Sequence, residues 1–155
     1  MRSLKVYLWL FALVALSGLL LMFFYVPSAA PPKSPAPSTG VSLGYVLRGV
    51  HFWAAQFAVL AVLTHMARTV FVKTNRPRSG WVVALVLLTG LLWFTGFLLP
   101  WDQLAFWMQR WLPGISAENA LWAVYRTHTL ALSLLTLPLL FVYVRRTRRD
   151  PVPSA

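Results

Sequence analysis

Four long apolar runs, separated by short polar segments, dominate the pattern of the chain. They cover about residues 6–26, 43–67, 81–99 and 120–144. Each run is close to the ~20 residues that a helix needs to cross a membrane. Backbone groups in lipid must bond internally, and the runs lack the short alternation of a barrel, so we expect helices. The pattern predicts an all-α, polytopic membrane four-helix bundle, with a single domain over 1–155 and an outside loop over the Pro/Ser-rich stretch 27–42.

Composition and charge support this interpretation and predict an orientation. The chain is 59% hydrophobic and 11% charged, whereas soluble domains carry about 25% charged residues. In a four-span topology, ten of the fourteen basic residues fall on one side: Arg2, Lys5, Arg68, Lys73, Arg76, Arg78, Arg145, Arg146, Arg148 and Arg149. This positive-inside pattern predicts cytoplasmic termini for a multi-pass protein of the inner (plasma) membrane. It argues against a nucleic-acid partner, which would need basic residues gathered on a soluble face.

Histidine placement indicates the chemistry. His51 and His65 are fourteen residues apart, which in a helix is about 1400°, within ~40° of four turns, and a rise of roughly 21 Å. They therefore share one helix face, one near each side of the membrane, and His128 lies in the fourth run. One explanation for His51 is a buried imidazole bonded to a neighbouring helix. The other is axial ligation of haem iron. Arg48, one turn away, favours this second explanation. An intramembrane arginine costs about 2.5–3.5 kcal/mol, and a haem propionate would be a partner that explains its presence.

Several motifs are similar to a known family. The second run carries Arg48-x-x-His51 and then His65-x-x-Arg68, the third ends in Leu99-Pro100-Trp101-Asp102-Gln103, and the fourth contains His128-Thr129. Together, over about residues 5–150, they resemble the N-terminal four-helix half of cytochrome b in its cytochrome b6 form. The absence of cysteine excludes thioether-linked haem and iron–sulfur ligation by this chain.

The resemblance implies an outer haem b site. His51 and His128 would be the axial ligands of the iron, and Arg48 would meet a propionate. Gly18 and Gly96 would lie beside the ring, where a Cβ would collide with it. Arg126 lies two residues before His128. It is either a replacement for an arginine that the family places three residues earlier or an interface residue.

The inner site that the resemblance implies is incomplete. Its second ligand should fall at Val142 or Tyr143, and its two glycines at Leu4 and Val82, so only His65 and Arg68 remain. We therefore expect one bis-histidine haem per chain. His65 is left as a remnant ligand or quinone contact, or as an ordinary interfacial residue. Tyr143 is expected to belong to an aromatic belt.

The function that the resemblance implies is electron transfer in a quinol-oxidising, bc- or b6f-like respiratory complex, as a subunit rather than a complete enzyme. The expected partners are membrane lipid, quinol or quinone, a C-terminal cytochrome b-like subunit, and an iron–sulfur or cytochrome c protein. One alternative is the haem-bearing membrane anchor of another dehydrogenase or reductase. Another is a haem-free scaffold subunit that keeps the fold.

Overall fold

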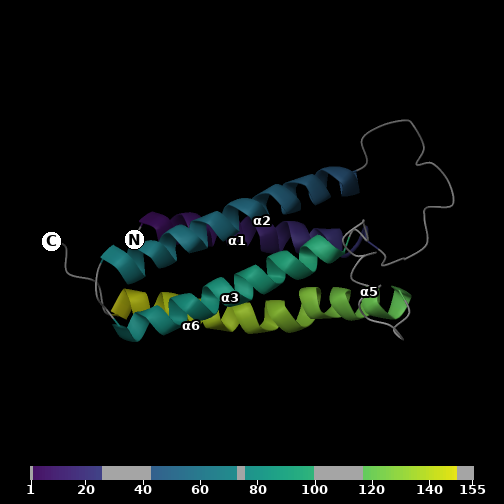
Figure 1. Ribbon diagram of the computed structural model, residues 1–155. Coiled ribbons are helices and arrows are strands. Elements are labelled where there is room, and N and C mark those ends of the chain that lie inside the picture. Colours follow the sequence, from purple (N-terminus) through teal and green to yellow (C-terminus); the bar gives the residue numbers. More distant parts are fainter. Residues whose placement is uncertain (1, 26–42, 73–75, 100–116, 150–155) are drawn as a thin grey trace.

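The computed structural model describes residues 2–25, 43–72, 76–99 and 117–149. The helices are α1 (Arg2–Leu21), α2 (Leu43–Ala67) extended by the π-helical turn η1 (Arg68–Val72), α3 (Arg76–Leu98), and a fourth, continuous rod of α5 (Ala117–Arg126), η2 (Thr127–Leu132) and α6 (Ser133–Arg149). Figure 1 shows α1 and α2 lying together along α3 and α6, with the start of α1 and the end of α6 at the same end of the bundle.

The predicted membrane helices are confirmed. Four helices are long and apolar enough to cross a membrane: Arg2–Leu21, Leu43–Phe71, Gly80–Leu98 and Asn119–Thr147. The second helix begins and ends as predicted, whereas α1 is shifted toward the N-terminus and ends at Leu21. There the backbone tightens, since Phe23 and Phe24 donate to carbonyls three residues back. The predicted loop 27–42 lies outside the described residues.

The outer surface of the bundle is apolar, as lipid contact requires. Large hydrophobic side chains are exposed on every span, among them Trp9, Leu16, Trp53, Phe57, Leu134 and Phe141. Because lipid is as apolar as these side chains, the helices are held together by close packing and interhelical hydrogen bonds. One such bond joins Trp93 Nε1, on α3, to Gln56 Oε1, on α2, at 2.9 Å.

The main buried cluster lies in the half of the bundle that contains the start of α1 and the end of α6, which we call the inner half. Its members are Leu4, Tyr7, Phe11, Ala58, Val62, Val82, Leu85, Leu140 and Tyr143. A buried hydrogen bond of 2.8 Å between Tyr7 Oη and Thr89 Oγ1 joins α1 to α3 within this half. We call the opposite half, where α1 and α3 end and α2 and α5 begin, the outer half.

The fourth helix changes its winding at His128, which lies inside the π-helical segment η2. A π-helical turn holds one more residue than an α-helical one and is frequent at functional sites. It alters the register of α6 relative to α5, so that Tyr143 faces the bundle at 3% exposure whereas Val142 is exposed. Tyr143 therefore occupies the position opposite His65, and the expectation that it belongs to a lipid-facing aromatic belt is wrong.

Candidate functional site

His51 on α2 and His128 on η2 lie close together between the helices of the outer half. Their ring centroids are 6.3 Å apart and the rings are inclined by 78°. Bonds of about 2.0–2.1 Å join imidazole nitrogens to metals such as zinc. Two such bonds, with about 1 Å more from each nitrogen to its ring centroid, span on the order of 6 Å. The separation of the two rings therefore fits a metal ion held between them.

His51 is oriented by α1 through its Nδ1 atom. That nitrogen is 3.0 Å from the Val14 carbonyl oxygen and 3.1 Å from Ser17 Oγ. A carbonyl oxygen accepts only, so Nδ1 carries the proton. The lone pair of the neutral ring is then on Nε2, which is the nitrogen that would bind a metal.

His128 is held in the same way by α3. Its Nδ1 is 3.0 Å from Thr95 Oγ1, and that hydroxyl donates to the Leu91 carbonyl oxygen at 2.7 Å. Because the hydroxyl proton is used within α3, Thr95 Oγ1 accepts from Nδ1–H, which again leaves the lone pair on Nε2. Such outer hydrogen bonds are what fixes the tautomer and orientation of metal-ligating histidines.

Gly18 and Gly96 leave room for the imidazole rings of His51 and His128, respectively. A Cβ built on Gly18 would lie 2.9 Å from His51 Cε1, and one on Gly96 would lie 2.9 Å from His128 Cε1. Real Cβ atoms essentially never come under 3.0 Å of another heavy atom, so each glycine admits an imidazole. The side-chain atoms that face the glycines are thus those of the histidines, and contact with a haem ring stays a prediction.

The donor set fits a haem better than a simple metal site. In the part of the chain that the structure describes, no three His, Cys, Asp or Glu side chains gather to hold an ion. A porphyrin supplies four equatorial nitrogens of its own, so iron in haem needs only two axial ligands from the protein. His51 and His128 are two neutral imidazoles at a suitable separation.

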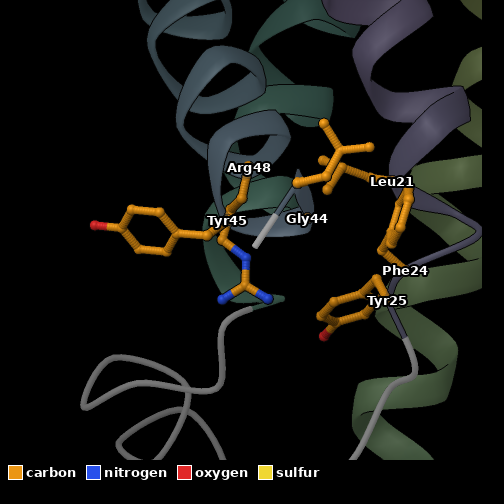
Figure 2. Close-up of a pocket in the computed structure, with 7 residues that line it drawn as sticks. Leu21, Phe24, Tyr25, Gly44, Tyr45 and Arg48 are labelled. Carbon is orange, nitrogen blue, oxygen red and sulfur yellow. The ribbon is translucent and has the colours of Figure 1, made fainter. Parts of the chain in front are cut away.

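Arg48 lies one turn outward from His51 and lines a cavity of about 330 Å³. The other lining residues are Leu21, Phe24, Tyr25, Leu43, Gly44 and Tyr45, and Figure 2 shows the guanidinium directed to the same side as the Tyr25 ring. Tyr25 donates to the Leu99 carbonyl oxygen at 2.6 Å and stacks on Tyr125. Burial raises the pKa of its phenol, against the opposing effect of Arg48, so Tyr25 stays a neutral donor.

Two other candidate arginines lie elsewhere. The Arg126 guanidinium packs over the Trp122 ring on its own helix, 5.9 Å from the centroid, and its side chain is exposed. Arg68 begins η1 and is also exposed. Of the three candidate arginines, Arg48 is therefore the one that lines the cavity in the outer half of the bundle.

His65 is not an ordinary interfacial histidine, because it is buried among three helices. Its Nε2 is 2.6 Å from Tyr143 Oη and its Nδ1 is 3.2 Å from Ser3 Oγ. Both ring nitrogens therefore have protein partners. Leu4 and Val82, at 7% and 0% exposure, are packed in the adjacent core cluster. At this end of the bundle, the positions that the resemblance assigns to an inner haem are occupied by side chains in contact with other protein groups.

Sequence reasoning missed Ser17 and Thr95, the two hydroxyl partners of the histidines. A signal for them was present, because each stands directly before one of the two glycines, as Ser17-Gly18 and Thr95-Gly96. It also left open whether Val142 or Tyr143 stands opposite His65. The answer depends on η2, whose i→i+5 winding has no clear mark in the sequence.

Comparison with known proteins places this chain in a family. Cytochrome b6 of Gracilaria tenuistipitata var. liui is 27% identical over 168 residues, which cover 92% of this chain and 78% of that protein. Cytochrome b6 of Heliomicrobium gestii is 37% identical over 103 residues, and that of Synechococcus sp. (strain WH7803) is 34% identical over 107. These two matches cover 63% and 65% of this chain, and 48% and 49% of those proteins, about half their length. A model of the family described as cytochrome b/b6/petB matches residues 4–125. The chain therefore belongs to the cytochrome b/b6/petB family, which implies that it binds haem.

Proposed function

We propose that this chain is a haem-b-binding electron-transfer subunit of a quinol-oxidising membrane complex, with one haem held between His51 and His128. The observation that carries the proposal is the paired arrangement of these rings. They stand 6.3 Å apart, and each Nδ1 is anchored to a different neighbouring helix. Family membership adds the haem and the relationship to cytochrome b6 proteins.

Each residue of the site has a role in this proposal. His51 and His128 would hold the iron through Nε2, while Gly18 and Gly96 let the imidazoles approach the backbones of α1 and α3. Arg48 would bind a propionate at the outer end. When bound, haem b accepts and releases one electron at a time. The protein sets its potential through the ligands, their hydrogen bonds and burial.

We further propose that the inner half carries no haem. Support comes from His65, whose two ring nitrogens bond to Ser3 and Tyr143. It also comes from Leu4 and Val82, which belong to the packed core. An electron path across the membrane through two haems in series is then interrupted in this chain. This chain would then depend on a partner subunit to complete electron transfer.

The remaining features of the proposal concern topology and partners. The basic residues at the inner ends of the spans favour cytoplasmic termini and location in the plasma membrane. We propose a single domain over 1–155, completed by a C-terminal cytochrome b-like subunit and by an iron–sulfur or cytochrome c partner.

The deciding experiment is a haem count on the purified protein together with its reduced-minus-oxidised spectrum. We expect one haem b per chain, loss of the six-coordinate spectrum in His51→Ala and in His128→Ala, and its retention in His65→Ala. A ratio near two, or iron bound at His65, would refute the one-haem proposal. A protein without haem would favour the scaffold alternative. Haem with no reduction by quinol in the assembled complex would favour the anchor of another dehydrogenase.

A further inference from the structure

The same two-residue arrangement occurs twice in the outer half of the bundle. In each copy, a hydroxyl residue and the glycine that follows it form what we call a hydroxyl–glycine step: Ser17-Gly18 on α1 and Thr95-Gly96 on α3. The hydroxyl oxygen lies 3.1 Å from Nδ1 of His51 in the first copy and 3.0 Å from Nδ1 of His128 in the second. The glycine lies against Cε1 of the same ring in both copies.

We propose that Ser17 and Thr95 are positioning residues that strengthen the two histidines as electron donors to iron and so lower the reduction potential of the haem. The inference rests on the proposed haem site between His51 and His128. It goes further, because it assigns the tuning of that site to two hydroxyl groups that do not bind iron.

Hydrogen-bond directions carry the proposal. Ser17 Oγ donates to the Leu13 carbonyl oxygen at 2.7 Å, as Thr95 Oγ1 does to the Leu91 carbonyl oxygen. A hydroxyl that donates becomes a better acceptor, because hydrogen bonds in a chain polarise one another. Each Nδ1–H thus donates to a polarised oxygen within a weakly polar interior. This raises the basicity of the ligating nitrogen and stabilises ferric over ferrous iron.

Backbone contacts allow an effect on donor strength to be told apart from a loss of ring orientation. His51 Nδ1 also contacts the Val14 carbonyl oxygen, and His128 also donates a hydrogen bond to the backbone of Leu92. When a hydroxyl is removed, each ring therefore keeps a partner that holds its orientation. The expected result is a change in donor strength with the ligand still bound.

The inner half shows that the hydroxyl contact does not depend on the glycine. Fourteen residues before Ser17-Gly18 the chain reads Ser3-Leu4. Ser3 Oγ lies 3.2 Å from Nδ1 of His65, although the residue after Ser3 is leucine rather than glycine. The two residues of the hydroxyl–glycine step therefore have separate effects. The hydroxyl contacts Nδ1, whereas the glycine leaves space beside the ring.

The test compares Thr95→Ala with Thr95→Ser, which differ only in the hydroxyl, and adds Ser17→Ala. The matched control is Thr64→Ala, because the Thr64 hydroxyl bonds only to its own helix, at Leu60, on an exposed face. The readouts are haem content, the low-spin ferric spectrum and the midpoint potential from redox titration. None of these depends on activity.

We expect a more positive potential in Thr95→Ala and in Ser17→Ala, by a factor of about ten in the reduction equilibrium, which is about 59 mV for one electron. Thr95→Ser and Thr64→Ala should keep the wild-type potential. An unchanged potential in both alanine variants, or an equal shift in Thr95→Ala and Thr95→Ser, would overturn the inference while leaving the haem site intact. A wild-type protein without haem would instead refute the proposed function.

Discussion

Replacing Gly96 with alanine tests the site without substituting a proposed ligand or a hydrogen-bonding side chain. The new Cβ would lie 2.9 Å from His128 Cε1, and 3.5 Å from both ring nitrogens. The imidazole is pinned by Thr95 on one side and, in the proposed holoprotein, by iron on the other. It can reach an ordinary contact distance only by moving several tenths of an ångström away from α3. That movement lengthens the Nδ1 hydrogen bond and shifts Nε2.

The size of the effect follows from the cost of overpacking. One extra carbon in a well-packed interior costs about 1–3 kcal/mol. If this cost falls on the holoprotein, haem affinity drops by roughly 5- to 150-fold, because each 1.4 kcal/mol is tenfold. Gly18→Ala should behave alike, since its Cβ would meet His51 Cε1 at the same distance.

The matched control is Gly90→Ala on the same helix, six residues earlier. Nothing lies within 4 Å of a Cβ built there. Alanine is favoured over glycine in a helix interior by about 1 kcal/mol, so this variant should keep its haem and lose no stability. Haem release to apomyoglobin, followed by absorbance, measures the affinity of all variants. Equal affinity in Gly96→Ala and Gly90→Ala would refute the proposed role of the glycine.

Three further outcomes are expected. Because the chain has no cysteine, Tyr45→Cys should react with an impermeant maleimide from outside intact cells and Arg145→Cys should not; the reverse pattern would exchange the two sides. Tyr143→Phe should lower the free energy of unfolding by about 1–3 kcal/mol, because it leaves a buried nitrogen of His65 without its partner, and thermal melts that match wild type would contradict this. Arg48→Gln should lower the midpoint potential, by up to about 59 mV, because a nearby positive charge stabilises the reduced haem; a raised potential would show that Arg48 does not face it.

The helices and the principal histidines were predictable because their signals are strong and local. A run of about twenty apolar residues admits few structures in a membrane. The shared face of His51 and His65 depends only on the helical period. The ends of α1 were less predictable, because the tight turn at Phe23 and Phe24 depends on backbone geometry rather than on hydropathy.

The arrangement of the inner half could not be predicted from the sequence, because it depends on packing between distant segments. Whether Val142 or Tyr143 faces His65 is decided by the π-helical segment η2, in which one extra residue rotates everything that follows. The bond from Tyr143 Oη to His65 Nε2 joins residues 78 positions apart. No local pattern specifies such a pair, whereas the absence of glycine at positions 4 and 82 was visible at once.

The two ends of this bundle use equivalent positions for opposite purposes. On α1 the position occupied by Gly18 in the outer half corresponds to Leu4 in the inner half, and on α3 Gly96 corresponds to Val82, each fourteen residues earlier. The glycines leave space that imidazoles fill, whereas the larger residues join a core cluster. In a membrane, where helices associate through packing and hydrogen bonds, that cluster stabilises the bundle, and under the one-haem proposal it does so without a cofactor. The inner half can therefore act as the fixed support on which the outer half positions its two histidines.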